Sequence, residues 1–195
     1  MKRAPGGLRS ARCRRSRLSL AYIAFCAPLK YELGGRYGCP VCMDMIVILQ
    51  PAEPDDVAFA YEVTEAAMRV YVEQTWGAWD VALQLVNNAK SFDPSTHHLV
   101  LVDGKRAGIV ATVCAESCVQ LEKLYLLPAF QNLGVGSQVL LKLFQSSTFD
   151  GKAVRLRVLK VNEAAQRFYR RFGFVVTSTT PQRVFMEASP AQRHV

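Results

Sequence analysis

The hydrophobic and polar positions change their period along residues 46–187. A short apolar run at 46–49, ended by Gln50-Pro51, predicts a first strand. After Pro54, apolar or small residues recur three and four positions apart, which predicts a helix with one buried face. These residues are Ala60, Val63, Ala67, Met68, Tyr71 and Val72. A second, less periodic helix is predicted over 79–89.

The middle of the chain has the pattern of a β-meander. Strand-like runs at 99–102 and 107–113 flank Asp103-Gly104, a two-residue signal for a hairpin turn. A third strand is predicted at 118–127, after a short connection. Three consecutive antiparallel strands are therefore expected.

The third strand carries an irregularity in its apolar spacing. Leu121, Leu124 and Leu126 are separated by three positions and then by two. Strict alternation would put Leu121 on the other face of the sheet, so the spacing predicts a β-bulge near Glu122 or Lys123. A bulge redirects side chains and spreads neighbouring strands.

The last third alternates helices and strands. One helix follows residues 131–136 and has an apolar stripe. A strand is predicted at 154–159, and then a helix with Asn162 as N-cap and Gly173 at its end. Two strands, at 175–177 and 184–186, complete an α/β or α+β fold with a mixed sheet.

Charge divides the chain of 195 residues into two regions. Of its 24 Lys and Arg residues and 16 Asp and Glu residues, 9 basic and 2 acidic ones lie in residues 1–44. The remainder, 45–195, is nearly neutral, so no nucleic-acid partner is expected. The sequence predicts a basic, disordered extension at 1–44 and a globular domain at 45–195.

The extension has an Arg-rich part and then an apolar run at 18–29. This run is shorter than the about 20 residues that cross a bilayer, so no membrane partner is expected. A secretory signal, a transit peptide, or translation that starts at Met43 or Met45 each fit the pattern. A cytoplasmic domain is the expectation.

The six cysteines do not indicate a metal centre. Cys39 and Cys42 have metal-ligand spacing but provide two of the four ligands that structural zinc needs. Cys114 and Cys118 could complete the set only if the fold brought them there. Incidental reduced thiols are favoured, and no metal is expected.

The stretch Gln131-Asn132-Leu133-Gly134-Val135-Gly136 is the first candidate for chemistry. Two glycines directly before a helix let backbone N–H groups converge, and the helix dipole adds partial positive charge. Phosphate or pyrophosphate suits such a place. On these residues alone, a tight strand-to-helix turn fits equally well.

Two linked motifs carry a resemblance to a known family. Leu124-Tyr125-Leu126-Leu127-Pro128 precedes Gln131-x-x-Gly134-x-Gly136, and Asn162-x-x-Ala165-x-x-x-Tyr169-x-x-x-Gly173-Phe174 follows. Together they resemble the GNAT superfamily of N-acetyltransferases over roughly residues 46–187. The resemblance implies a mixed sheet whose fourth and fifth strands splay apart, with acetyl-CoA bound in the opening.

The resemblance also implies an activity and its partners. An acetyl group would pass from acetyl-CoA to a primary amine of a small molecule or protein by direct attack. Homodimers are common among such proteins. The alternative is a non-catalytic module that binds acyl-CoA as a sensor on the same fold.

The resemblance further implies positions for the cofactor. The pantetheine arm would pair with the backbone of Leu124, Tyr125 and Leu126, and Asn162 would bond the arm or cap its helix. The pyrophosphate would bind the stretch made by Gln131, Asn132, Leu133, Gly134, Val135, Gly136 and Ser137. Many members have Gly and then Arg or Lys where this chain has Asn132 and Leu133, so one phosphate-facing cation is missing.

Catalytic and acceptor residues are assigned in the same way. Tyr169 matches the family's general acid, although it also fits a core tyrosine. Glu122 is the candidate base, acting directly or through water, although it also fits a solvated strand residue. The acceptor pocket would involve Tyr71, Trp76 and Trp79, although tryptophans are as often core residues. His97 and His98 are interpreted as surface histidines.

Overall fold

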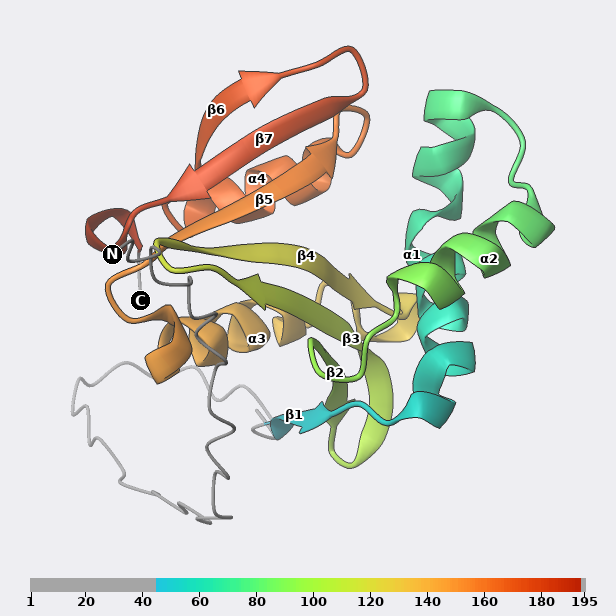
Figure 1. The fold of residues 1–195 in the computed structure, drawn as a ribbon, viewed down its shortest axis with the longest axis horizontal. Helices are drawn as coiled ribbons and strands as arrows, with labels where there is room; N and C mark the ends of the chain where they lie inside the picture. Colours follow the sequence, from blue (N-terminus) through green and yellow to red (C-terminus); the bar gives the residue numbers. More distant parts are fainter. Residues whose placement is uncertain (1–44, 194–195) are drawn as a thin grey trace, which may run out of the picture. The chain divides into compact units, whose positions relative to one another are not determined.

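The computed structural model describes residues 45–193, so the predictions for 1–44, including the Cys39 and Cys42 pair, lie outside the described residues. Seven strands and four α-helices make up the domain (Figure 1). The strands are β1 (Val47–Pro51), β2 (His97–Val102), β3 (Lys105–Cys114), β4 (Cys118–Leu126), β5 (Ala153–Leu159), β6 (Val175–Thr179) and β7 (Arg183–Ala188). The helices are α1 (Val57–Trp76), α2 (Val81–Ser91), α3 (Val135–Phe144) and α4 (Glu163–Arg171).

All seven strands form one mixed sheet in the order β1-β2-β3-β4-β5-β7-β6. The neighbours are antiparallel except β4 and β5, which run parallel. Asp103 and Gly104 form the turn between β2 and β3, and both have positive φ, at 50° and 77°. This is the backbone of a two-residue hairpin turn, and it confirms the predicted meander.

The predicted bulge lies at Glu122. Ala111 of β3 pairs with Lys123, whereas the next residue, Thr112, pairs with Leu121, so Glu122 has no partner across the ladder. On its other side, β4 pairs with β5 only from Cys118 to Leu121. Beyond the bulge the two strands separate, which confirms the splayed sheet.

Alternation along the strands builds a core on each face of the sheet. Val100 and Val110 belong to the larger cluster, which includes apolar residues of α3 and α4. Leu99 and Ile109, one position away, pack with Ala60 and Val63 of α1. Successive strand residues point to opposite faces, so α1 covers one face while α3 and α4 cover the other.

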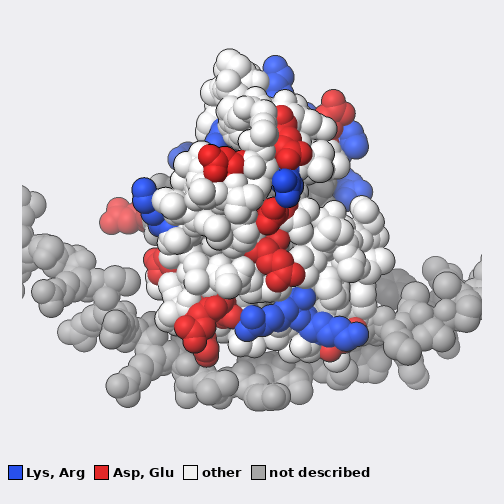
Figure 2. Space-filling view, turned by 90° about the vertical axis from the view of Figure 1, so that its right-hand side faces the viewer, with Lys and Arg blue, Asp and Glu red and all other residues white. Residues whose placement is uncertain are grey.

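Helices α1 and α2 form a hairpin that projects beyond the sheet (Figure 1). Only Ala60 and Val63 of α1 are buried, so the apolar face predicted for the whole helix is partly open in its second half. Asp80 caps α2, because its carboxylate accepts from Leu83 N–H at 3.0 Å. Figure 2 shows acidic side chains in a column on this side of the molecule, and on α1 both Glu65 and Glu73 bond Arg69.

Within residues 45–193 no helix is long and apolar enough to cross a bilayer. No group of three potential metal-ligating side chains occurs in this part of the chain either, and Cys114 and Cys118 are free thiols. The cytoplasmic location stays a prediction from the sequence.

Candidate active site

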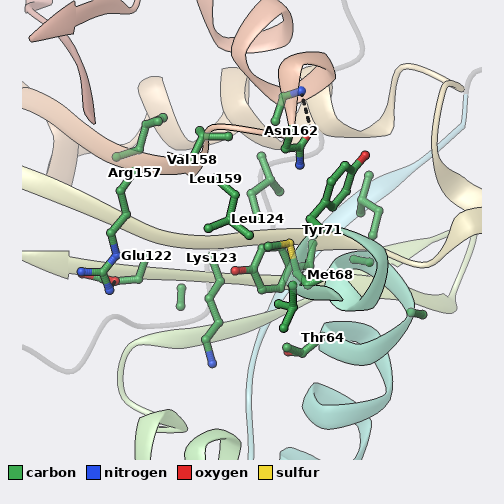
Figure 3. A pocket seen from close by; sticks show the side chains of 18 of the residues that line it. Thr64, Met68, Tyr71, Glu122, Lys123, Leu124, Arg157, Val158, Leu159 and Asn162 are labelled. Carbon is green, nitrogen blue, oxygen red and sulfur yellow. Dashed lines mark hydrogen bonds and ion pairs between the residues drawn. The ribbon is translucent and has the colours of Figure 1, made fainter. Parts of the chain in front are cut away.

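A cleft of about 1510 Å³ opens where β4 and β5 stop pairing. Figure 3 shows side chains of β4 and β5 on its walls, together with residues of α1 and Asn162. The fold brings most of the predicted site residues to this cleft. They are Tyr71, Trp76, Trp79, Glu122, Leu124, Tyr125, Leu126, Gln131, Asn132, Gly134, Gly136, Ser137, Asn162 and Tyr169.

Two residues of the predicted set lie outside the lining. Leu133 is 51% exposed and points away from the core. Val135, the first residue of α3, is fully buried in the larger cluster. Each could serve the site through its backbone N–H alone.

Backbone groups of β4 face the cleft beyond the bulge. The Tyr125 carbonyl oxygen lies against Gly108 of β3, so Tyr125 presents its backbone groups to the sheet. In an antiparallel pair the next residues present theirs to the opposite side. The Leu126 carbonyl oxygen accepts from Gln131 Nε2 at 2.7 Å, which agrees with that direction. The N–H groups of Leu124 and Leu126 therefore point into the opening.

The glycine stretch ends in a left-handed turn that starts α3. Asn132 has a φ of 59° and Gly134 one of 82°, a region that glycine adopts without strain. The first bond within α3 runs from Gln138 N–H to the Gly134 carbonyl. Among the described residues no acceptor contacts the N–H groups from Asn132 to Ser137. Such a cluster of N–H groups at a helix start binds anions.

Tyr169 reaches the cleft from α4 through an aromatic cluster. Its ring is 8% exposed and packs edge-on against Phe168 and Phe174, with ring centroids 5.1 and 5.4 Å away. Burial, and then the nearby Tyr125, raise the pKa of the Tyr169 phenol above its ordinary value. The hydroxyl is therefore protonated at physiological pH, so it has a proton to donate.

Glu122 forms an ion pair across the splayed strands. Arg157 Nη2 of β5 donates to Glu122 Oε2 at 2.7 Å, and Figure 3 shows the two side chains together. Both are partly exposed, at 29% for Glu122 and 45% for Arg157. The second carboxylate oxygen has no partner among residues 45–193, so it is free to bond a ligand or water.

Asn162 caps α4, as predicted. Its Oδ1 accepts from Ala165 N–H at 3.0 Å. Because the cap uses the oxygen alone, the side-chain NH₂ stays available as a donor. Asn162 also lines the cleft, so capping and ligand binding are compatible in one side chain.

The aromatic residues lie at the α1–α2 end of the cleft. Trp79 is 7% exposed, and its indole N–H donates to Tyr61 Oη at 3.3 Å. Trp76 is 53% exposed, and the Arg183 guanidinium of β7 lies 5.8 Å from its ring centroid. Trp79 therefore holds the connection between α1 and α2 against α1, whereas Trp76 of α1 and Arg183 of β7 line the cleft.

The surface interpretation is wrong for His97. Its side chain is 3% exposed, because the Phe92 ring packs against it at 4.9 Å and α2 ends above it. His98 is partly buried. Burial lowers the pKa of both imidazoles below the ordinary value.

Four cationic side chains of the cleft were not predicted from the sequence. They are Lys123, Arg157, Arg171 and Arg183. Arg157 follows a buried residue in the alternating pattern of β5, which was a signal for an outward-facing charge. Lys123 and Arg183 contact residues of distant elements, Ser91 and Trp76, whereas Arg171 contacts Phe168 of its own helix.

Comparisons with known proteins agree with this geometry. Residues 94–176 match the family model of the acetyltransferase (GNAT) domain. The sequence matches no curated protein.

Solved structures share the fold at low identity. A PaiA N-acetyltransferase from Thermoplasma acidophilum in complex with coenzyme A has 17% identity and a TM-score of 0.61, with 74% of this chain and 99% of that chain covered. Naa50 from Arabidopsis thaliana, in complex with a bisubstrate analogue, has 18% identity and a TM-score of 0.52, covering 73% and 98%. The ribosomal-protein-S18-alanine N-acetyltransferase from Escherichia coli has 18% identity and a TM-score of 0.58, covering 77% and 96%.

The matched segment includes the bulged strand, the glycine stretch and α4, all of which line the cleft. The strand order and the splay between β4 and β5 agree with the fold of the solved structures. The chain therefore resembles the GNAT superfamily of acetyltransferases, through the match of residues 94–176 to its domain model and through the fold that it shares with the solved structures.

Proposed function

We propose that the protein transfers an acetyl group from acetyl-CoA to a primary amine of a small molecule or protein by direct attack. The observation that carries this proposal is the cleft between β4 and β5, which has free N–H groups at one end and a buried tyrosine hydroxyl on its wall. An acyl-CoA needs both an anion site and an extended channel beside it. The solved PaiA structure, which contains coenzyme A, has the same fold.

The residues present fit the cofactor. The N–H groups from Asn132 to Ser137 would bind the pyrophosphate, because no other acceptor in the described part of the chain satisfies them. The free edge of β4 would pair with the pantetheine arm through the backbone groups of Leu124, which leaves Leu126 N–H for the thioester carbonyl. The Asn162 NH₂ group would donate to the same arm.

Arg171 supports the proposal at the point where the sequence departs from the family. Its guanidinium lies 5.8 Å from the centroid of the Phe168 ring. That ring in turn lies beside Gly136, with its Cζ atom 3.5 Å from where a Gly136 side chain would begin. Arg171 is in none of the ion pairs formed among residues 45–193. It would replace the cation that Asn132 and Leu133 do not supply.

The chain's own residues would move the protons of the reaction. Acetyl-CoA supplies the acetyl group as a thioester. As the amine nitrogen bonds to the acetyl carbon and the C–S bond breaks, Leu126 N–H would stabilise the negative charge that develops on the carbonyl oxygen. Glu122, directly or through water, would accept the amine proton. Tyr169 would donate a proton or hydrogen bond to the departing sulphur.

Calorimetric titration with acetyl-CoA tests the cofactor site. We expect the wild-type protein to bind acetyl-CoA and to release free thiol only when an amine is added. Arg171→Ala should weaken binding about 10-fold, the effect of one charge-assisted contact to phosphate. Arg170→Ala is the matched control, since Arg170 is exposed and does not line the cleft. Failure of the wild-type protein to bind acetyl-CoA at millimolar concentration would overturn the proposed function.

Two substitutions of Asn162 separate its capping role from its role at the cleft. Asn162→Ala removes both, so it should lower the free energy of unfolding by about 1 kcal/mol and weaken binding of CoA. Asn162→Asp keeps the oxygen that accepts from Ala165 N–H but lacks the NH₂ donor. We expect Asn162→Asp to unfold at the same urea concentration as the wild type and to bind CoA more weakly than the wild type. Wild-type affinity in Asn162→Asp would show that Asn162 is only a cap.

A further inference from the structure

Lys123 and His97 occupy one row of the sheet. Lys123 of β4 pairs with Ala111 of β3, and Ala111 pairs with His97 of β2. Directly paired residues project to the same face, so both side chains lie on the face covered by α1 and α2. Figure 3 shows Lys123 pointing away from β4 on the side opposite Asn162. Both residues line the cleft. We call the part of the cleft beside α1 and α2, where the acceptor pocket is predicted, the acceptor end.

The ammonium group of Lys123 lacks a counter-ion. It donates to Ser91 Oγ, at the end of α2, at 3.0 Å. Its neighbour Glu122 is paired with Arg157 instead, and no carboxylate forms an ion pair with Lys123 in the described part of the chain. Burial lowers the pKa of Lys123 below its ordinary value. A partly desolvated cation without a carboxylate is costly, and an anionic ligand would offset that cost.

His97 provides an independent observation at the same place. Its Nδ1 contacts the Asp93 carbonyl oxygen at 3.0 Å and Thr96 Oγ1 at 3.1 Å. Its Nε2 is buried and has no partner among residues 45–193. Buried polar atoms in folded proteins nearly always have a partner. Nδ1 also accepts from Asp93 N–H at 3.4 Å, and in that tautomer the proton of the neutral ring lies on Nε2. An acceptor group beside Nε2 would then give this nitrogen a partner.

The other charges of the cleft favour the same class of ligand. The two acidic residues of the lining are engaged, Glu122 by Arg157 and Asp80 by the N-terminus of α2. Arg183, beside Trp76, is in none of the ion pairs formed among the described residues. The acceptor end therefore presents cations to a substrate and is poorly suited to a polycationic amine.

We infer that Lys123 and Ser91, with His97 behind them, form an anion subsite that binds a carboxylate of the amine acceptor. The preferred acceptor would be an amino acid, or a peptide with an acidic side chain near its amino terminus. This inference rests on the proposed function, because it assigns the chemistry of the acceptor at the same cleft.

Matched acceptors test the subsite. Each carboxylate acceptor is compared with its carboxamide, using glutamate against glutamine and Asp-peptides against Asn-peptides of the same length. We expect the wild-type protein to favour the carboxylate about 10- to 100-fold in kcat/KM. Lys123→Met should abolish that preference and Lys123→Arg should retain most of it. Lys142→Met, an exposed substitution on α3, should leave it unchanged.

Binding is measured as well as turnover, so that two failures can be told apart. The same acceptors are titrated by calorimetry into protein mixed with CoA, which requires no reaction. A carboxylate preference that disappears in Lys123→Met supports the subsite, whether or not acetyl transfer is seen. Equal binding of acids and amides to the wild-type protein would overturn the subsite while leaving the proposed function in place. A lack of CoA binding, by contrast, would overturn the proposed function.

Discussion

Replacement of Tyr169 by phenylalanine should lower kcat about 100-fold or more while the affinity for CoA stays within about twofold of the wild type. The lower bound is the usual contribution of a positioned general acid. The substitution removes one oxygen atom and keeps the ring, whose contact with Phe174 packs α4 against the core. A loss of rate would therefore report the hydroxyl and not the packing.

The raised pKa of Tyr169 adds a condition on pH. A group whose pKa lies above the ordinary value of tyrosine stays protonated through the whole neutral range. The rate should thus show no titration of this residue between about pH 6 and 9, where the unperturbed phenol is already neutral. Stopped-assay rates across this range, with saturating acetyl-CoA, check the expectation.

Tyr61→Phe is the matched control for loss of a phenol oxygen. Tyr61 lies on α1, outside the cleft lining, and its hydroxyl accepts from the Trp79 indole. The Tyr61→Phe variant should transfer the acetyl group at the wild-type rate. If Tyr169→Phe retains full activity, the assignment of Tyr169 as the acid is wrong. If the wild type and Tyr169→Phe both bind CoA and neither transfers an acetyl group, the non-catalytic acyl-CoA-binding alternative gains support.

Gly108→Ala should lower the free energy of unfolding by about 3 kcal/mol, the upper part of the range for overpacked sites. A side chain at Gly108 would meet β4 backbone, with the Leu126 Cα atom 3.0 Å away and the Tyr125 carbonyl oxygen nearer than van der Waals contact allows. Backbone atoms in the middle of a sheet cannot rotate aside. The substitution would displace the segment of β4 that presents its N–H groups to the cleft, so CoA binding should weaken as well.

Gly136→Ala serves as the comparison for this substitution. A Cβ atom there would make an ordinary contact of 3.5 Å with the Phe168 ring, and the residue lies in the first turn of α3. It should unfold at the same urea concentration as the wild type or a slightly higher one. If Gly108→Ala unfolded at the same urea concentration as Gly136→Ala, the close approach of β3 and β4 at Gly108 would be contradicted.

Local spacing was enough to predict the parts of the fold that local chemistry decides. The leucine spacing in β4 gave the bulge at Glu122, because alternation along a strand is strict. Asp103-Gly104 gave its hairpin, and Asn162 gave the cap of α4. The bulge and the glycine stretch also defined the cofactor side of the cleft, since both lie within 15 positions of each other in the chain.

The acceptor side could not be predicted in the same way. The Glu122–Arg157 ion pair joins residues 35 positions apart, and Lys123 meets Ser91 across 32 positions. His97 looked like a surface residue beside a polar turn, and the burial that makes it notable comes from Phe92 folding back over it. Such contacts depend on how α2 sits on the sheet, which no periodicity in the sequence describes.

The short ladder between β4 and β5 has a consequence for the molecule as a whole. Four residue pairs form the backbone ladder that joins the two halves of the sheet. Beyond this ladder the halves are joined by the Glu122–Arg157 ion pair, which is exposed enough for salt to weaken it. A ligand lying in the opening would touch both halves and supply the connections that the backbone lacks there. Binding to the folded state alone stabilises that state. Acetyl-CoA, bound as proposed, would therefore hold the two halves of the sheet together and raise the free energy of unfolding.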